Sequence, residues 1–318
     1  MDYIKSPINY TGNKYRILPQ IEQFFPQQAR IFVDLFCGGA TVGFNVKADH
    51  IILVDNNPYV INLLKFLAEE KFSVIIKDIM SIIKKYNLSC SLKETYKHYR
   101  EQGFVIGNNG LKAYNAKGFA QLKHDYNLLR SKTTKKANVY LYTLMVYGFN
   151  NDIRFNSNGD FNLPVGKTDF NKNNFNKLKE YNQRAREINY EFLCADFRSD
   201  VVAEKLLQAD FIYCDPPYLI TDAVYNEKNA WTNKEEEELL NLLAKLSNEG
   251  KRFALSNVIE KEGKDNFLLK KWVKENGFNR QDIIYHYRSA SYNKINRNAG
   301  EQEVLIYNGM VQHGTKDK

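Results

Sequence analysis

The sequence predicts an α/β fold in which a parallel β-sheet is covered by helices and carries one long insertion. In the first 85 residues, and again from residue 190 onward, short apolar runs alternate with helical stretches, a pattern typical of parallel sheets. One run leads straight into a glycine-rich turn, as in folds that bind nucleotide-like ligands. Between residues 86 and 189 the alternation breaks and the chain becomes rich in Asn, Lys and Tyr. We therefore expect a main domain of residues 1–85 and 190–318, with residues 86–189 inserted into it.

The predicted elements alternate along the main domain, and the insertion is expected to be mostly helical. Helices are expected near residues 14–25, 58–85, 234–248 and 260–276. Strands are expected near residues 31–36, 51–54, 190–194, 210–214, 252–257, 281–288 and 302–308, the last two as an antiparallel hairpin.

The glycine-rich turn at residues 34–43 indicates a ligand-binding cradle. Glycines permit positive φ and close backbone approach, and the helix start that follows presents N–H groups to a ligand. The spacing differs from the dinucleotide and P-loop patterns, so a ligand without phosphate groups fits better. The next predicted strand ends at Asp55, where doubly wound folds hydrogen-bond a ribose hydroxyl. An aspartate at a strand end is also often only a helix cap, but its place after the glycine turn favours the ribose.

The tetrapeptide Asp215-Pro216-Pro217-Tyr218 follows a predicted strand and indicates chemistry on an amino group. The two prolines stop both the strand and immediate helix formation, so the acid and the tyrosine are presented at a strand end. The carboxylate and a neighbouring carbonyl can accept two hydrogen bonds from one NH2 group, and the tyrosine ring can stack on a flat heterocycle. Taken alone, a proline-stiffened turn that caps a core strand explains the motif equally well.

Within the insertion, residues 147–167 predict a polar β-hairpin that contacts nucleic acid. Its asparagines and glycines suit hairpin turns, and aromatic residues alternate along it. Side chains able to read base edges stand among rings able to stack on bases. An irregular solvated loop is the alternative interpretation.

Composition and charge agree with a sizeable core and a polyanionic partner. The chain has 318 residues, of which 43% are hydrophobic and 26% charged, with a net charge of +8. A sequence pI near 9.0 suits a polyanionic partner, although a basic surface is also common on proteins that never bind DNA. The four cysteines show no paired metal spacing, so no metal site is expected. With no signal-peptide core and no apolar run of membrane length, we expect a cytoplasmic protein without membrane segments.

Taken in order, these motifs resemble those of the Dam family, the α group of DNA adenine-N6 methyltransferases. The resemblance covers nearly the whole chain. It begins at residues 9–15, which are similar to the family's W-x-G-G-K motif, with Tyr10 in place of tryptophan and Lys14 retained. The other matching segments are residues 34–43, Asp55, and residues 194–197, 215–218, 256–257 and 302–308.

The resemblance implies a Rossmann-like sheet that binds S-adenosyl-L-methionine. Tyr10 and Lys14 are implied to close over the cofactor, Asp34 to meet its methionine ammonium, Asp55 its ribose, and residues 196–197 its adenine. The implied cofactor residues are Tyr10, Lys14, Asp34, Phe36, Gly38, Gly39, Asp55, Asn56, Asp196, Phe197 and Asp215.

The implied reaction is methyl transfer to the exocyclic N6 of an adenine flipped out of duplex DNA. Asp215 and the carbonyl of Pro216 would hold the amine, Pro217 would shape the turn, and Tyr218 would stack on the base, with catalysis mainly by positioning. A C5-cytosine enzyme needs a cysteine after a proline, and N4-cytosine enzymes usually present serine at the position of Asp215. A non-catalytic DNA-binding regulator that keeps the methyltransferase fold is the alternative of a different class.

The resemblance also implies that residues 86–189 are a target-recognition domain, with the hairpin near residues 147–167. Arg154 is implied to pair with a guanine, Pro164 to touch a thymine methyl, and Phe149 with Asn150 to fill the gap left by the adenine. The implied DNA-binding residues are Asn9, Phe149, Asn150, Asp152, Arg154, Asn156, Asn162, Pro164 and Lys167.

Two departures from the family pattern leave the recognised sequence open between GATC and a related site. Members specific for GATC often carry lysine where this chain has Asn9, and an apolar residue where it has Asp152. The implied partner is double-stranded DNA. We expect a monomer in solution, and leave open a dimer on DNA and a cognate restriction endonuclease.

Overall fold

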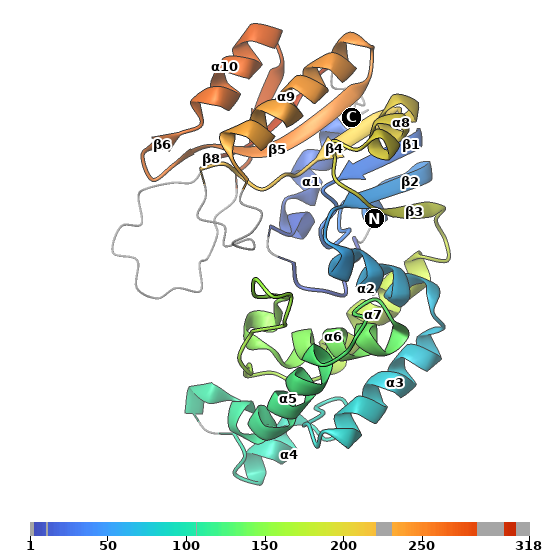
Figure 1. Cartoon of the computed structure of the whole chain (residues 1–318), viewed down its shortest axis with the longest axis vertical. Coiled ribbons are helices and arrows are strands. Elements are labelled where there is room, and N and C mark those ends of the chain that lie inside the picture. The colour runs from blue at the N-terminus through green and yellow to red at the C-terminus, as the bar shows by residue number, and fades with distance from the viewer. Residues whose placement is uncertain (1–2, 11, 106, 221–230, 285–301, 310–318) are drawn as a thin grey trace, which may run out of the picture.

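The computed structural model describes residues 3–10, 12–105, 107–220, 231–284 and 302–309, which form one large sheet flanked by helices (Figure 1). Across these residues the strands lie in the order β3-β2-β1-β4-β5-β8-β7, with β6 paired to β5. The strands are β1 (Ala29–Leu35), β2 (Ala48–Asp55), β3 (Tyr190–Cys194), β4 (Phe211–Cys214), β5 (Arg252–Lys261), β6 (Lys264–Asp265), β7 (Asn279–Asp282) and β8 (Gln302–Tyr307).

Helices cover both faces of this sheet and extend well beyond it (Figure 1). The α-helices of the described residues are α1 (Leu18–Ile21), α2 (Pro58–Glu69), α3 (Phe72–Lys85), α4 (Tyr96–Glu101), α5 (Lys112–Asn127), α6 (Lys135–Tyr147), α7 (Lys172–Arg184), α8 (Asp200–Gln208), α9 (Asn233–Asn248) and α10 (Phe267–Asn276). Short 3-10 turns are η1 (Lys14–Arg16), η2 (Glu22–Phe24), η3 (Gly43–Asn45), η4 (Gly107–Asn109) and η5 (Phe149–Asn151).

The pairing of the strands confirms a mixed α/β fold with a mostly parallel sheet. β1 pairs in parallel with β2 and β4, and parallel pairing continues to β3 and β5. β8 pairs antiparallel with β5 and β7, so the expected antiparallel final pair is confirmed. The strand order changes direction between β1 and β4, and open α/β sheets bind ligands in the crevice at such a point.

Successive residues of the strands point to two separate hydrophobic cores, as the pleat of a strand requires. Val33 and Leu35 of β1 belong to a cluster with buried side chains of α8, α9 and α10. Phe32, from the same strand, belongs to a cluster with α1, α2 and α7. The sheet therefore supports helices on both faces.

Two predicted helices are interrupted in the structure. The stretch 14–25 forms η1, α1 and η2 in place of one helix, and the stretch 58–85 forms α2 and α3. The second interruption lies at Glu70, whose backbone is extended with ψ 151°. The buried side chain of Asn182 donates hydrogen bonds to the carbonyls of Leu67, Ala68 and Glu70, which satisfies the end of α2. A residue from α7 therefore fixes this helix end, which local sequence does not reveal.

The predicted helix at residues 260–276 begins too early. β5 continues to Lys261, and Glu262 and Gly263 have φ of 50° and 78°, the conformation of a tight hairpin turn into β6. Asn266 then accepts a hydrogen bond from the backbone of Leu269 and caps α10. Helix α8 was not among the predicted elements. The predicted strand 281–288 overlaps β7 only at residues 281 and 282, and its positions 285–288 lie outside the described residues.

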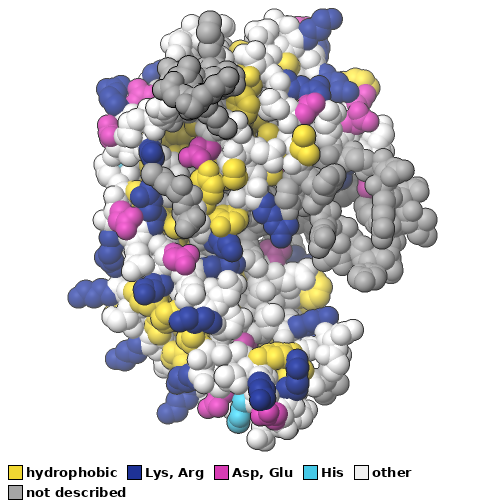
Figure 2. Space-filling model, turned by 180° about the vertical axis from the view of Figure 1, so that it is seen from behind, with side chains coloured by type: hydrophobic (Ala, Val, Ile, Leu, Met, Phe, Trp, Pro, Cys, Tyr) yellow, Lys and Arg dark blue, Asp and Glu magenta, His cyan; other side chains and the backbone are white. Residues whose placement is uncertain are grey.

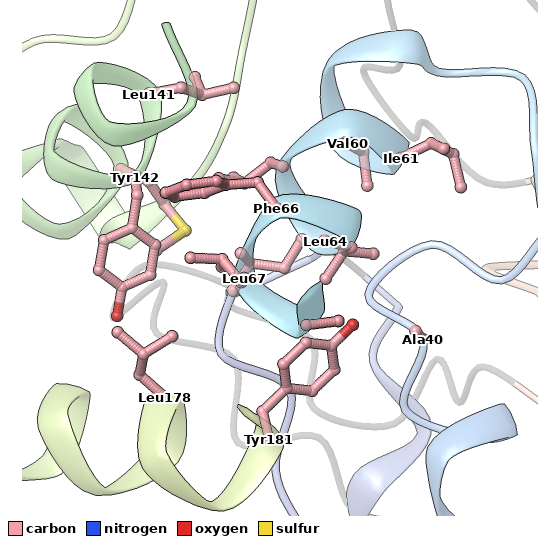
Figure 3. Packing of buried hydrophobic residues seen from close by; sticks show 14 of the residues in the cluster. Ala40, Val60, Ile61, Leu64, Phe66, Leu67, Leu141, Tyr142, Leu178 and Tyr181 are labelled. Atoms are coloured by element: carbon pink, nitrogen blue, oxygen red, sulfur yellow. The ribbon is translucent and has the colours of Figure 1, made fainter. Parts of the chain in front are cut away.

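Helices α4 to α7 lie in the stretch that the sequence marks as irregular, and α6 is its centre. All side chains from Ala137 to Tyr147 are buried, because α6 is enclosed by α2, α3 and α5. Figure 3 shows Leu67 of α2 beside Tyr142 of α6, with Leu178 and Tyr181 of α7 below them. One hydrophobic cluster thus runs from the sheet into this helical part. Among the described residues, no helix has the length and apolar character needed to span a membrane.

Candidate active site

Four strand ends bring the predicted motifs to one edge of the sheet. Because β1, β2, β3 and β4 are parallel neighbours, their carboxyl ends meet at this edge, where Asp55 ends β2 and Gly38, Asp196 and Asp215 follow the other three strands. Among the described residues, no group of three or more His, Cys, Asp or Glu side chains is arranged to hold a metal ion.

The glycine turn after β1 is shaped for close approach by other groups. Gly38 has φ 48°, and a Cβ added there would lie 2.8 Å from Cδ1 of Tyr10. The Tyr10 ring therefore lies directly on the turn. Its closing over a cofactor stays a prediction. Phe36 and Ala40 hold φ of 69° and 57°, values that non-glycine residues rarely adopt. Such strain at a turn is characteristic of a functional site.

Asp55 holds the turn and the next helix together. One carboxylate oxygen accepts a hydrogen bond from the backbone of Gly38 at 3.0 Å, and the other accepts one from the backbone of Asn57 at 2.9 Å. Burial raises the pKa of Asp55, and these hydrogen bonds oppose the rise. The side chain is half-buried, so it can still meet a ligand, and the neighbouring Asn56 is exposed. The ribose role remains a prediction.

Asp34 lies beneath the turn, with only 1% of its surface exposed. Its Oδ2 accepts a hydrogen bond from the backbone of Gly43 at 2.8 Å. Burial raises the pKa of Asp34 to about 7, while the Gly43 hydrogen bond opposes this shift and the charges of Asp215 and Asp55 add to it. In this geometry Asp34 organises the turn from below, whereas its contact with a methionine ammonium stays a prediction.

Asp215 is the centre of a buried polar cluster. Its Oδ2 lies 2.8 Å from Nζ of Lys14, and its Oδ1 accepts a hydrogen bond from the Tyr218 hydroxyl at 3.0 Å. Burial raises the pKa of Asp215, and Lys14 and Tyr218 lower it in part. Lys14 itself is only 3% exposed and lies 5.2 Å from the centre of the Tyr218 ring. Pro216 is buried and Pro217 is half-buried, so the tetrapeptide forms a rigid corner.

Glu303 is a site residue that the motif analysis missed. Its Oε1 accepts a hydrogen bond from the Tyr218 hydroxyl at 3.2 Å and lies 3.7 Å from Nζ of Lys14, with 5% of the residue exposed. The sequence does hold a signal, since Glu303 is an acid beside the apolar run Val304 to Ile306 of a predicted core strand. A buried acid needs a partner, and here the partners are Lys14 and Tyr218.

The adenine-binding residues implied by the family lie at the end of β3. Phe197 is buried, and its ring centre lies 5.4 Å from that of Phe36. Asp196 binds the guanidinium of Arg198 at 2.7 and 2.8 Å, and this pairing lowers the pKa of Asp196. Phe36 and Phe197, both implied as cofactor residues, thus meet, whereas Asp196 is bound by a neighbouring arginine.

The predicted hairpin at residues 147–167 is more irregular than expected. Two isolated antiparallel bridges, Gly148 to Val165 and Phe155 to Phe161, join its arms in place of a continuous ladder. Phe155 and Phe161 are buried, and Phe155 packs on Tyr59 of α2 with ring centres 4.3 Å apart. These aromatics therefore anchor the segment to the core beside the end of β2, whereas the sequence suggested rings along an exposed hairpin.

Most of the implied base-reading side chains of this segment are exposed. Phe149 is 47% exposed, and Asn150 stands beside it with φ 57°. Arg154 donates from Nε to Oδ1 of Asn162 at 2.8 Å, which orients its guanidinium. Pro164 is exposed, and its carbonyl accepts the backbone N–H of Phe149.

Three further residues of the implied DNA-binding set are Asn156, Asp152 and Lys167. Asn156 accepts backbone hydrogen bonds from Asn158 and Asp160 and so shapes the turn. Asp152 is half-buried and its pKa is raised by burial. Lys167 is exposed, while its backbone carbonyl accepts from Leu111.

Asn9 lies beside the site, next to Tyr10. It is exposed, and its Oδ1 accepts a hydrogen bond from Nζ of Lys177 on α7 at 3.3 Å. Figure 2 shows one face of the molecule, on which Lys and Arg side chains are spread over both the sheet and the helical part. The molecule thus combines an acidic buried site with a surface on which basic side chains are widespread.

Comparisons with known proteins agree with this geometry. A profile of D12 class N6 adenine-specific DNA methyltransferases matches residues 10–288. The chain is 36% identical over 312 residues to the type II methyltransferase M.FokI of Planomicrobium okeanokoites, covering 96% of this chain and 43% of that protein. It is 34% identical, with the same coverage, to the modification methylase StsI of Streptococcus sanguinis.

The chain spans less than half the length of these two relatives. It is 24% identical over 317 residues to the DNA adenine methylase of Escherichia coli (strain K12), covering 97% of this chain and 98% of that protein. The resemblance drawn from the motifs is confirmed, and the chain belongs to the D12 class of N6 adenine-specific DNA methyltransferases.

Proposed function

We propose that this chain transfers a methyl group from S-adenosyl-L-methionine to the N6 of an adenine flipped out of duplex DNA. The observation that carries the proposal is the position of Asp215 at the end of β4, adjacent to β1 and its glycine turn. The Asp215 carboxylate would accept hydrogen bonds from an amino group, and the glycine turn would hold the methyl donor. Because the two follow neighbouring strands, the methyl donor and the amino group come within reach of each other.

The residues at the strand ends fit this cofactor. The turn at Gly38 leaves no room for a Cβ, Asp55 has a half-buried carboxylate, and Phe36 offers a partly exposed ring. Three acids, Asp34, Asp55 and Asp215, also lie close enough at this edge of the sheet for their charges to interact. Such a field favours a cation, and S-adenosyl-L-methionine supplies a methyl group on a positively charged sulfur when bound.

The residues of the tetrapeptide would hold and orient the adenine. The carboxylate of Asp215 and the carbonyl of Pro216 would accept the two N6 hydrogens, which directs the nitrogen lone pair toward the methyl group. Tyr218 would stack on the base. The carboxylate would also stabilise positive charge that develops on N6 and take up the proton released there.

We further propose that residues 86–189 form the target-recognition domain, with residues 1–85 and 190–318 as the catalytic, cofactor-binding domain. Arg154 would read a guanine, and Phe149 with Asn150 would occupy the space left by the adenine. The exposure of these three side chains supports this assignment. The site would be GATC or a related sequence.

The names of the relatives support a role in restriction and modification. M.FokI is named a type II methyltransferase and StsI a modification methylase. We propose that this chain likewise protects a sequence from a cognate endonuclease, acting in the cytoplasm as a monomer that can pair on DNA.

Mapping of methylated adenines tests the function directly. Duplex DNA is incubated with the protein and S-adenosyl-L-methionine and then sequenced for N6-methyladenine. We expect one adenine in a short defined site to be methylated by the wild-type chain and none by Asp215→Ala, with DNA and cofactor binding largely retained. Methylation by Asp215→Ala would overturn the mechanism. DNA binding without methylation by the wild-type chain would instead identify a non-catalytic regulator.

A further inference from the structure

A buried carboxylate in α9 takes no part in the proposed chemistry but has three side-chain donors. Glu236 is 0% exposed, and its Oε2 accepts a hydrogen bond from the indole Nε1 of Trp231 at 2.6 Å. Its Oε1 accepts from the side-chain amides of Asn257 at 3.0 Å and Asn266 at 3.2 Å. A buried acid is costly unless it is satisfied in this way, so the arrangement holds its partners firmly.

The partner that gains a fixed orientation is Trp231. Asn257 lies in β5 and Asn266 caps α10, so both amides are already held by secondary structure. Trp231 precedes α9, and its indole is oriented by the bond to Glu236. The ring is only half-buried, which leaves part of it uncovered.

The indole meets two rings of the proposed cofactor site. Its centre lies 5.6 Å from that of Phe36, at 85°, and 5.8 Å from that of Phe197, at 43°. Phe36 directly follows β1 and lies in the glycine turn, and Phe197 follows the end of β3. Three segments that are distant in the sequence thus build one aromatic corner at the ligand-binding edge of the sheet. Phe36 and Trp231 are both half-buried and present ring surface there.

We propose that Trp231 forms a wall of the pocket for the cofactor's adenine, and that Glu236 is a positioning residue that orients its indole. This proposal rests on the proposed function, since it assumes that S-adenosyl-L-methionine binds at the glycine turn. A flat heteroaromatic ring such as adenine gains stacking contacts with these aromatic rings. The indole Nε1 already donates to Glu236, so Trp231 contributes its ring surface to the pocket. Glu236 then acts on the cofactor only through Trp231.

Calorimetric titration with S-adenosyl-L-methionine and with 5′-methylthioadenosine tests the wall. Both ligands carry adenosine, but only the first carries the methionine part. We expect Trp231→Ala to weaken both by a similar factor, on the order of tenfold or more, and Trp231→Phe to weaken them less. Trp272→Phe is the control, since this second tryptophan lies in α10, packs on Phe253 and Phe278, and should leave both affinities unchanged when replaced.

A double-mutant cycle tests the role of Glu236. Glu236→Gln should weaken both ligands in the wild-type background but have no further effect in Trp231→Phe, because phenylalanine has no N–H for residue 236 to hold. A purely structural role of Glu236 would weaken binding equally in both backgrounds. Thermal unfolding of each variant shows whether it is folded.

Fluorescence gives a readout that does not remove Trp231. The chain has two tryptophans, so Trp272→Phe leaves Trp231 as the reporter. Both ligands should change its emission. If the wild-type chain binds S-adenosyl-L-methionine while Trp231→Ala keeps the wild-type affinities, or the emission stays constant on binding, this proposal is wrong and the proposed function stands. If the wild-type chain binds no S-adenosyl-L-methionine, both are overturned.

Discussion

Nζ of Lys14 lies 2.8 Å from Oδ2 of Asp215, so a lysine at the start of the 3-10 turn η1 binds the carboxylate that follows β4. The Lys14 ammonium occupies a carboxylate oxygen of Asp215 that an amino group of the substrate would use as a hydrogen-bond acceptor. Its Nζ also lies 3.7 Å from Oε1 of Glu303. An entering amine would share or replace this contact, and the charge of Lys14 opposes the rise in the pKa of Asp215 that burial causes.

Replacing Lys14 by methionine should shift the pH dependence of methyl transfer. Burial already raises the pKa of Asp215, and Lys14 opposes that rise, so its loss should raise the pKa further. Because the carboxylate form is the active acceptor, the acidic limb of the single-turnover rate profile should move to higher pH. Rates measured from pH 5 to 9 check this, and Lys14→Arg should remain closer to wild type. An unchanged limb would mean that Lys14 does not control Asp215.

Replacing Gly38 by alanine should weaken cofactor binding. The substitution adds a Cβ 2.8 Å from Tyr10 and strains a residue at φ 48°, costing about 1 to 3 kcal/mol for the backbone alone. Gly250→Ala is the matched control, because Gly250 has φ 81° with nothing within 4 Å of the added Cβ. Both variants should lose stability in thermal melts, but only Gly38→Ala should lose affinity in calorimetry. If Gly38→Ala binds the cofactor as tightly as the wild-type chain does, the turn does not meet the cofactor.

Replacing Arg154 by alanine should relax selection at one base pair. Arginine bound to a guanine edge contributes about 1 to 3 kcal/mol of discrimination. Methylation rates on duplexes with single substitutions measure this, and Asn162→Ala should cause a weaker defect at the same position because Asn162 orients Nε of Arg154. Lys167→Ala serves as the comparison for a phosphate contact. Should Arg154→Ala slow all duplexes equally, Arg154 would also be a phosphate contact.

Replacing Asp34 by asparagine should remove a pH-dependent loss of stability. The native pKa is raised to about 7 from 3.8, so the folded state keeps a proton that the unfolded state releases between about pH 4 and 7. Wild-type stability therefore falls as pH rises through that window, whereas the variant, whose amide oxygen can still accept from Gly43, should fall less. Urea unfolding at pH 5 and pH 8 measures the difference. A parallel loss of cofactor affinity would support the predicted contact with the methionine ammonium.

Local sequence was a good guide to elements whose signals are local and a poor one where distant residues intervene. The predicted strands 31–36 and 51–54 correspond to β1 and β2, because buried parallel strands are continuous apolar runs. The break between α2 and α3 was missed, since it depends on Asn182 of α7. The helix expected from residue 260 was misplaced, because antiparallel pairing with β8 extends β5 through Glu260.

By itself, the sequence determined the family and the order of its motifs, because the glycine turn and the Asp-Pro-Pro-Tyr corner depend on residue identity and short spacing. Only the tertiary structure decided that Lys14 and Tyr218 meet both Asp215 and Glu303, and that Trp231 joins Phe36 and Phe197. These residues come from opposite ends of the chain or from different strand ends. Their proximity follows from the strand order of the sheet, which no local pattern encodes.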